Sequence, residues 1–508
     1  MFKDDSRCAV QDEIQRQGMK SFTHILSRDV IVEAAQAAGL TIRKTPLNLG
    51  NLVWLGIACA LHRSKSFADV LVLTLKILSD SEGFSSTKLG RAEARDRRPT
   101  SAKSKKKKQS KHNPHGSRRA VVSEEAFVQA RQKMPWGFWT ALVVLLADRF
   151  AAQHASHLCW KGFRLLALDG TVVNLPNEAA LAEHFGTARN GKAKKKWKKR
   201  TPQARMALMQ FPLSRVPYRF EVSPLKVGEK TMARGMMSAL RAGDLLLFDR
   251  GFWSFGLFWD VQNRGAFFGI RLVAKVKLTT VRRLGPGDRI VWYAPADPKR
   301  RWKKDGYAPS IELRVIDYQI PGFRKSAIVT NVLDPKKLSR DDWVRLTTQS
   351  EPGSRLAPGL YHRRWEIETT FRELKVTQGM QRSLRGRTPG SILYEIASHV
   401  VLYLLTRWLM MEAALAHGKD PLRLSFTQAR RELDDLQYAL IVSSPRHVSN
   451  VLLPRLLERV ASHAVPLRLG RHFPRPDDTR TKIKRRGCIT LPAKLKYKRK
   501  PKALKRAA

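Results

Sequence analysis

The 508-residue sequence has few cysteines, few acidic residues and no long apolar run. Its four cysteines lie far apart, without a CxxC pair or a histidine at metal-ligand spacing. This argues against a disulfide scaffold and a Cys/His zinc site, and it fits a reducing cytosol. The longest apolar stretches, residues 52–61 and 399–415, are shorter than the roughly 18 residues of a membrane span or are interrupted by charge. We therefore expect two core helices there and no membrane partner.

Acidic residues are scarce relative to basic ones. The chain has 43 Asp and Glu against 95 Lys and Arg, which gives a formal charge of +52. Residues 88–119, 189–205 and 466–508 together contribute 34 of these positive charges. One such cluster alone is as readily a solvated linker or tail, whereas three with little compensating acid favour contacts with a phosphate backbone. Nucleic acid is therefore the expected partner, but the charge does not identify a reaction.

The hydrophobic pattern changes along the chain. Residues 1–88 have the spacing of short apolar helices, which suits a DNA-binding module but also a generic helical bundle. From about residue 160, short apolar strands bounded by Gly and Pro alternate with helices, which indicates an α/β fold. Residues 262–340 are rich in strand signals, and helices return from residue 341 to about 460.

Two aspartates each follow an apolar strand of the α/β region. Asp169 follows residues 163–168 and Asp249 follows residues 244–248. One such aspartate is more often a turn former or a helix cap, because a buried carboxylate without a partner is costly. Two in one domain favour a shared cation, and oxygen ligands at a sheet edge suit Mg²⁺ or Mn²⁺.

A third carboxylate lies on a helix that the sequence predicts to begin near Tyr361. At about 100° per residue, Tyr361, Arg364, Glu368 and Lys375 fall within about 60° of arc, so they share one face. The alternative is an ordinary amphipathic helix with i,i+4 charge pairs, to which Glu366, Arg372 and Glu373 would belong. The spacing of three, four and seven residues favours a functional face.

Four motifs occur in order along the chain: Leu168-Asp169-Gly170-Thr171, His184-Phe185-Gly186, Asp249-Arg250-Gly251-Phe252, and Tyr361-x2-Arg364-x3-Glu368-x6-Lys375. The last matches the Y-(2)-R-(3)-E-(6)-K pattern of the insertion-sequence-four family of bacterial DDE transposases, and the two aspartate boxes resemble those of the same family. The resemblance covers roughly residues 160–405. The helix motif is highly specific, whereas each aspartate box alone is a weak signal.

The resemblance implies a ribonuclease-H-like catalytic core, of α/β class, interrupted by a β-rich insertion. Asp169, Asp249 and Glu368 would be catalytic residues and would hold two Mg²⁺ or Mn²⁺ ions, while Tyr361, Arg364 and Lys375 would bind DNA phosphates. The expected organisation is a helical N-terminal DNA-binding domain (1–88), a basic flexible linker (89–122), the catalytic core (123–261 and 341–420), the insertion (262–340), a helical C-terminal region (421–465) and a basic tail (466–508).

The family further implies a reaction and partners. Water would hydrolyse a phosphodiester at an element end, and the freed 3′-hydroxyl would attack target DNA. The partners would be double-stranded DNA, both the terminal inverted repeats and the target, and a second copy of the chain in a synaptic homodimer. The expected location is the cytoplasm, at the nucleoid.

Alternatives remain open from the sequence. A catalytically inactive or repurposed transposase-derived DNA-binding protein would keep the same fold, and a nuclease of that fold is a further possibility. In the insertion, Trp292 and Trp302 are candidates for stacking on an extruded base, although tryptophans at such positions are more often packing residues.

Overall fold

The computed structural model describes Phe22 and residues 24–41, 47–70, 123–187, 201–294, 306–319, 325–344 and 359–465, apart from residues 64, 68, 275 and 444. All of these except residues 319 and 325 belong to one compact unit. The predicted linker (89–122), the lysine run (194–199) and the basic tail (466–508) lie outside the described residues.

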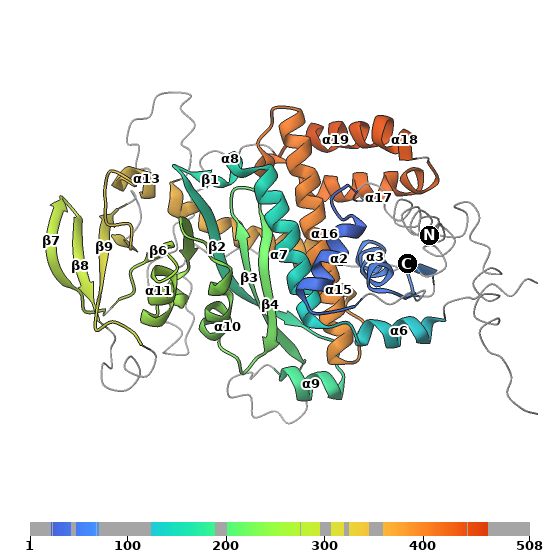
Figure 1. The fold of residues 1–508 in the computed structure, drawn as a ribbon, viewed down its shortest axis with the longest axis horizontal. Helices are drawn as coiled ribbons and strands as arrows, with labels where there is room; N and C mark the ends of the chain where they lie inside the picture. Colours follow the sequence, from blue (N-terminus) through green and yellow to red (C-terminus); the bar gives the residue numbers. More distant parts are fainter. Residues whose placement is uncertain are drawn as a thin grey trace, which may run out of the picture. The chain divides into compact units, whose positions relative to one another are not determined.

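Within these residues, ten strands form a single mixed sheet with the order β4-β3-β2-β5-β6-β10-β9-β8-β7, and β1 pairs with β2 (Figure 1). The strands are β1 (Cys159–Trp160), β2 (Phe163–Asn174), β3 (Gln203–Phe211), β4 (Val216–Pro224), β5 (Asp244–Phe248), β6 (Phe267–Arg271), β7 (Thr279–Gly285), β8 (Asp288–Tyr293), β9 (Ile311–Tyr318) and β10 (Ser326–Thr330). The β2–β5 and β5–β6 pairs are parallel, and the other pairs are antiparallel.

The helices precede, interrupt and follow this sheet. They are α2 (Arg28–Ala37), α3 (Leu49–Leu61), α6 (Glu124–Gln132), α7 (Trp136–Gln153), α8 (Ala155–Leu158), α9 (Ala179–Phe185), α10 (Glu229–Met236), α11 (Phe255–Gln262), α13 (Arg340–Val344), α14 (Glu366–Arg372), α15 (Met380–Ser383), α16 (Pro389–Ala416), α17 (Phe426–Val442), α18 (Pro445–His447) and α19 (Leu453–Ser462). The architecture is a mixed α/β fold with a large mixed sheet and many helices.

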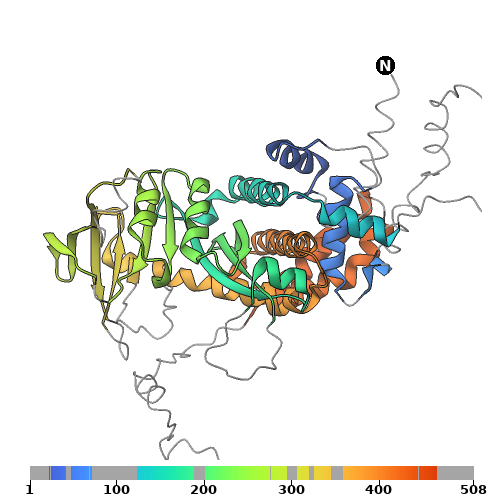
Figure 2. The ribbon, with the colours of Figure 1, turned by 90° about the horizontal axis from the view of Figure 1, so that it is seen from below.

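Helix α16 is the centre of the main hydrophobic core. It begins after Thr388, whose hydroxyl accepts a hydrogen bond from the amide of Ser391, with Pro389 in its first turn. The helix packs against α3, α7 and β4, and Figure 2 shows it running beside α7. By length and apolarity it could cross a membrane, but 83% of its most apolar window is buried inside the protein. It is therefore a core helix, as predicted for residues 399–415.

The N-terminal helices α2 and α3 share this core. Ser27 caps α2 by accepting a hydrogen bond from the Val30 amide, and Gly39 follows the helix with a left-handed φ of 68°. Helix α2 packs against α7, and α3 packs against both α2 and α16. The apolar residues of α2 and α3 belong to the same buried cluster as those of the sheet.

Strand β2 separates two buried clusters. Leu166 and Leu168 belong to the large cluster that includes α7 and α16, whereas Leu165 and Ala167 belong to a smaller one that includes Tyr361. Successive side chains of a strand point to opposite faces of the sheet. Leu165, Ala167 and, by the same alternation, residue 169 therefore lie on the face of the smaller cluster, whereas Val173 near the end of β2 belongs to the large one.

Candidate active site

The parallel pairing of β2 and β5 brings the two aspartates together. The last paired residues of this ladder are Leu168 and Phe248, and Asp169 and Asp249 follow them directly. Leu247 of β5 also belongs to the smaller cluster, so alternation predicts the same face of the sheet for both aspartates. The prediction that Asp169 ends its strand was wrong, because β2 continues to Asn174 through its pairing with β3. What ends at Asp169 is the ladder with β5.

The segment that carries Glu368 is a composite of three helix types. Leu360–Trp365 is a 3₁₀ helix, α14 follows, and Glu373–Thr377 forms a π-helical turn. The prediction of one regular helix from Tyr361 was therefore wrong. The segment is fixed to β5 at its start, because the Tyr361 hydroxyl donates a hydrogen bond to the carbonyl of Phe248, 2.9 Å away, directly before Asp249. Burial raises the pKa of Tyr361, which keeps the phenol neutral and a donor.

One guanidinium lies between the three predicted catalytic carboxylates. The Arg364 nitrogens are 3.8 Å from an oxygen of Asp169, 3.8 Å from one of Asp249 and 3.4 Å from one of Glu368. Arg364 is almost fully buried, and its guanidinium carbon lies 4.7 Å from the ring centre of Trp365. The side chains of Asp249 and Glu368 are 45% and 47% exposed, so the site is open to solvent on their side. Residues 80 and 119 positions apart in sequence thus converge on one point.

Burial sets the electrostatics of Asp169. It raises the pKa of this carboxyl from 3.8 to about 6, although the hydrogen bond from the Gly170 amide and the charge of Arg364 act in the opposite direction. Asp169 is therefore mostly ionised at neutral pH but close to its titration range. Lys375 reaches the same strand from the π-turn, with its ammonium 2.7 Å from the Thr171 hydroxyl oxygen. Burial lowers the pKa of Lys375.

The donor set fits a divalent cation. Carboxylate oxygens are the ligands that Mg²⁺ and Mn²⁺ prefer, and the exposed sides of Asp249 and Glu368 leave a path for entry. Across the part of the chain that the structure describes, no three His, Cys, Asp or Glu side chains are arranged to hold an ion as they stand. At this site Arg364 lies between the carboxylates, so it would have to leave their centre for a metal to bind there.

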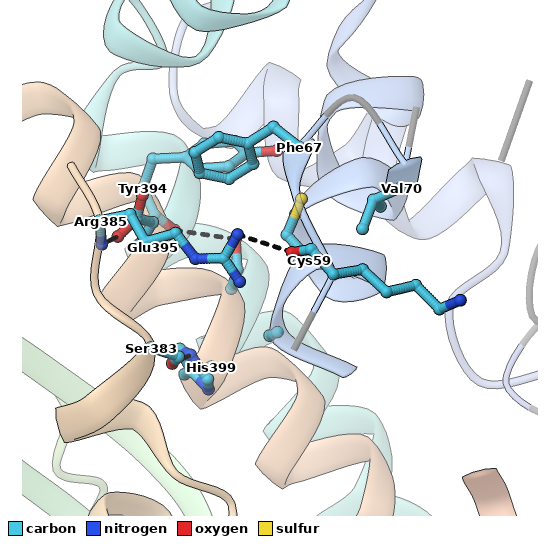
Figure 3. A pocket seen from close by; sticks show the side chains of 12 residues that line it. Cys59, Phe67, Val70, Ser383, Arg385, Tyr394, Glu395 and His399 are labelled. Atoms are coloured by element: carbon cyan, nitrogen blue, oxygen red, sulfur yellow. Dashed lines mark hydrogen bonds between the residues drawn. The ribbon is translucent and has the colours of Figure 1, made fainter. Parts of the chain in front are cut away.

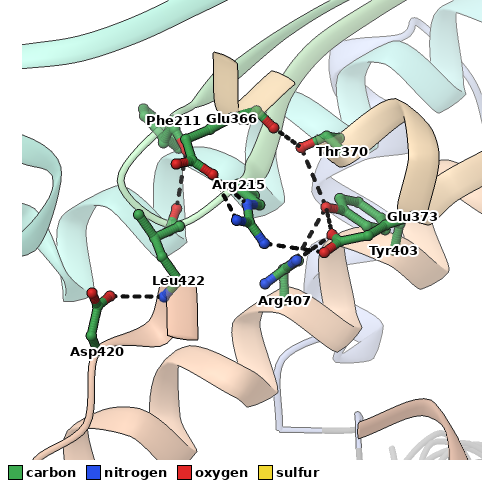
Figure 4. Close-up of polar contacts among 10 residues, drawn as sticks. Phe211, Arg215, Glu366, Thr370, Glu373, Tyr403, Arg407, Asp420 and Leu422 are labelled. Atoms are coloured by element: carbon green, nitrogen blue, oxygen red, sulfur yellow. Dashed lines mark hydrogen bonds and ion pairs between the residues drawn. The ribbon is translucent and has the colours of Figure 1, made fainter. Parts of the chain in front are cut away.

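Sequence reasoning missed a polar cluster on another side of the same segment. Glu373, a candidate for an i,i+4 charge pair within its own helix, is buried and contacts Arg215, Tyr403 and Arg407 (Figure 4). Arg215 lies in the turn between β3 and β4, and Arg407 lies in the middle of α16. A charged residue in an otherwise apolar helix, as Arg407 is, was the available signal, because such a residue needs a buried partner.

A pocket between α3 and α16 is separate from the three carboxylates. Cys59, Tyr394 and Glu395 are among its lining residues (Figure 3). The Glu395 carboxylate accepts hydrogen bonds from the Arg131 guanidinium and from the amides of Arg385 and Gly386. These groups satisfy one another, so the pocket is a packing feature between the two helices.

The remaining predicted residues lie elsewhere. Trp292 is half-exposed on β8, where its indole nitrogen donates to the Glu312 carboxylate at 3.3 Å. Trp302 is outside the described residues. The His184-Phe185-Gly186 motif ends α9, with Gly186 in a left-handed conformation and Phe185 buried in the core. This motif therefore ends α9, and its Phe185 side chain packs in the core.

Comparisons with known proteins agree with the motifs. Residues 160–405 match the family model of the transposase DDE domain. The chain is 26% identical over 374 residues to "Transposase InsG for insertion sequence element IS4" of Escherichia coli (strain K12), covering 70% of this chain and 77% of that protein. It is 23% identical over 150 residues to "Putative transposase InsZ" of the same strain, covering 28% of this chain and 48% of that protein.

A solved structure is also similar over most of its length. It is the cryo-EM structure of a piggyBac transposase synaptic complex with hairpin DNA. The structural alignment covers 94% of this chain and 91% of the piggyBac chain. The TM-score is 0.34 and the sequence identity 10%, a level that bears on neither fold nor function.

The domain match and the arrangement of the site define the class of protein: the chain is a DDE transposase. The long alignment to the IS4 transposase and the complete Y-R-E-K pattern support a DDE transposase of the insertion-sequence-four family. The predicted family and the predicted transposase function are confirmed.

Proposed function

We propose that this transposase cuts and joins the ends of an insertion element at Asp169, Asp249 and Glu368, in a ribonuclease-H-like core. The observation that carries the proposal is the convergence of these three carboxylates within 4 Å of one guanidinium. The parallel register of β2 and β5 and the fixed start of the 360–377 segment support it. The register places two carboxylates at adjacent strands of the core sheet, and the Tyr361 hydrogen bond fixes the segment that carries the third to β5.

Two divalent cations, Mg²⁺ or Mn²⁺, would be held by Asp169, Asp249 and Glu368. When bound, such ions activate an attacking oxygen and stabilise the leaving oxygen of an in-line displacement at phosphorus. The chain's contribution is a set of ionised oxygens on rigid elements. Because the pKa of Asp169 is about 6 in the metal-free protein, protons compete with a metal ion for this carboxyl increasingly below that pH.

The basic residues of the motif would position the DNA. Arg364 can form two parallel hydrogen bonds to a phosphate, and Lys375 offers a point charge beside Asp169 and Thr171. Tyr361 was predicted to bind phosphate, yet its buried hydroxyl already donates to a backbone carbonyl. We propose instead that Tyr361 supports Asp249. Water would attack a phosphodiester at the element end, the 3′-oxygen would leave, and the resulting 3′-hydroxyl would attack target DNA.

The partners would be double-stranded DNA, first the terminal inverted repeats and then the target. A synaptic complex of two chains is proposed because two ends must be brought together. The basic segments around residues 88–119 and 466–508 carry the charge to follow a phosphate backbone. We also propose that residues 1–88 contribute to end binding and that the protein acts in the cytoplasm, at the nucleoid.

Cleavage of DNA carrying the element's own ends tests this function. Glu368→Gln should abolish Mg²⁺-dependent cleavage while binding to the same DNA persists in a gel-shift assay. Glu183→Gln is the matched control, because Glu183 is exposed on α9, and it should cleave normally. Normal cleavage by Glu368→Gln would exclude the assignment, and equal loss in the control would show that the assay does not probe the site.

A further inference from the structure

The segment that carries Glu368 and Lys375 depends on contacts outside the site. It passes from 3₁₀ to α to π geometry within residues 360–377, and the π-turn closes where the Gln378 amide donates to the Glu373 carbonyl, 2.7 Å away. π-turns are rare, and they occur often at functional sites. A segment with three helix types has no single preferred register. Tertiary contacts must therefore fix the rotation of the segment about its helix axis and its position along that axis.

Arg215 makes contacts that can fix this register. Its guanidinium lies 2.7 Å from the Glu366 carboxylate and 3.1 Å from the Glu373 carboxylate, and its side chain is only 11% exposed. The two glutamates lie on either side of Glu368 in sequence, one at the start of α14 and one where the π-turn begins. The planar guanidinium of Arg215 thus contacts the segment at two points about two helical turns apart.

The backbone of Arg215 is held in an unusual conformation for these contacts. Its φ is 63°, in the left-handed region that disfavours residues with a Cβ. Its amide donates to the carbonyl of Phe211 at 2.7 Å, closing the turn between β3 and β4. Strain of this kind persists where the surrounding contacts over-determine it, and it concentrates at functional positions.

Glu373 is held from the other side by α16. The Tyr403 hydroxyl donates to the Glu373 carboxylate at 2.7 Å, and the Arg407 guanidinium donates to the same oxygen (Figure 4). Burial opposes ionisation of Glu373, but Arg407 and Arg215 outweigh burial and hold its pKa below the ordinary value. The Glu373 carboxylate is therefore ionised and held in place by α16, so the ion pair with Arg215 connects the β3–β4 turn to a fixed group.

These contacts join the elements that carry the predicted catalytic residues. Arg215 follows β3, and β3 pairs with β2 along its length, with Asp169 opposite Leu208. Through Arg215, the strand pair that carries Asp169 is tied to the helix that carries Glu368. We propose that Arg215 is a positioning residue, which sets the register of residues 366–377 and thereby the placement of Glu368 and Lys375 relative to Asp169. This inference rests on the proposed catalytic role of the three carboxylates.

The test compares Arg215→Gln and Arg215→Lys with Arg164→Gln. Arg164 is a matched control on β2 itself, where it makes a partly buried two-point contact with Asp244 at 2.6 and 2.7 Å. Mn²⁺ affinity of the DNA-free protein is measured by electron paramagnetic resonance, and the Mg²⁺ dependence of cleavage is measured at saturating DNA. Hydrogen exchange of residues 366–377 reports the segment directly.

Arg215→Gln should weaken Mn²⁺ binding and raise the Mg²⁺ requirement by about 10–100-fold, the usual effect of losing a group that orients metal ligands. It should speed hydrogen exchange in residues 366–377, and Arg215→Lys should recover part of each property. Arg164→Gln should lower thermal stability without these changes. Unchanged metal dependence and exchange in Arg215→Gln, or equal changes in Arg164→Gln, would overturn the inference.

Failure of the proposed function has a different signature. A wild-type protein that shows no metal-dependent cleavage, or a Glu368→Gln variant with normal Mn²⁺ affinity, would count against the catalytic assignment. Hydrogen exchange would still test the register in that case, because it needs neither metal nor DNA. If Arg215→Gln does not fold, Arg215→Lys carries the same comparison, since it keeps the charge but not the planar fork.

Discussion

Replacing Asp169 with Asn should stabilise the metal-free protein while removing a predicted ligand. Burial raises the pKa of Asp169 from 3.8 to about 6, so the folded state disfavours the charged form. At about 1.4 kcal/mol per pKa unit, ionised Asp169 lowers the free energy of unfolding by up to about 3 kcal/mol at pH 7.5. Asn carries no charge and keeps an acceptor for the Gly170 amide, which donates to Asp169 at 2.8 Å.

The stability gain of Asp169→Asn should depend on pH. The pKa of Asp169 is higher in the folded state than in the unfolded state, so ionisation of Asp169 lowers the free energy of unfolding. This loss grows as the pH rises from about 4 to about 6 and is constant above that range. The stability gain of Asp169→Asn should therefore be largest at pH 7.5 and about half as large at pH 5. Added Mg²⁺ should stabilise only the wild type, because binding to the folded state shifts the equilibrium.

Urea denaturation in EDTA, followed by tryptophan fluorescence, measures these differences. Asp317→Asn is the control, because Asp317 is a partly exposed carboxylate paired with Arg289 on the far strands of the sheet. It should give no gain at either pH. If Asp169→Asn is no more stable than the wild type at pH 7.5, or if its gain does not shrink on acidification, the attribution to burial is refuted.

Four further substitutions test other parts of the structure. Arg364→Gln should bind Mn²⁺ more tightly in the absence of DNA, because the Arg364 guanidinium lies within 4 Å of the three carboxylates and repels a metal ion there. Weaker binding of Mn²⁺ by the variant in a calorimetric titration would contradict this. Tyr361→Phe should lose about 1 kcal/mol of unfolding free energy through its missing hydrogen bond; an unchanged melting temperature would show that the bond adds nothing. Gly56→Ala should cost about 1–3 kcal/mol, because its Cβ would lie 2.3 Å from a side-chain oxygen of α16. Gly137→Ala, where a Cβ meets no atom within 4 Å, should instead gain up to about 1 kcal/mol in the same thermal denaturation.

The core elements around the site could be predicted because their patterns are local. Ser27 and Gly39 bound α2 through contacts with residues close by in sequence, and the Gly- and Pro-containing residues 285–288 form the turn between β7 and β8. Residues 399–415 were predicted as a core helix because Arg407 interrupts an otherwise apolar run. Local chemistry does not specify the partner of Arg407, since Glu373 lies 34 positions away.

The geometry of the site required the tertiary structure. Helical spacing offered Glu373 only an i,i+4 pair, because it describes neighbours on one helix, whereas its partners come from α16 and the β3–β4 turn. The composite helix from residue 360 was also not predictable. Its 3₁₀ and π turns accompany long-range contacts, of Tyr361 with β5 and of Glu373 with Arg215.

The sequence by itself determined the class of this protein. The spacing of Tyr361, Arg364, Glu368 and Lys375 and the two aspartate boxes depend only on residue identity and order, and so does the positive charge that predicts a polyanionic partner. The tertiary structure decided which groups meet. The parallel register of β2 and β5 places Asp169 beside Asp249, and the fold buries Arg364 between the carboxylates. Strand register and burial arise from contacts between residues far apart in the chain, which no local pattern encodes.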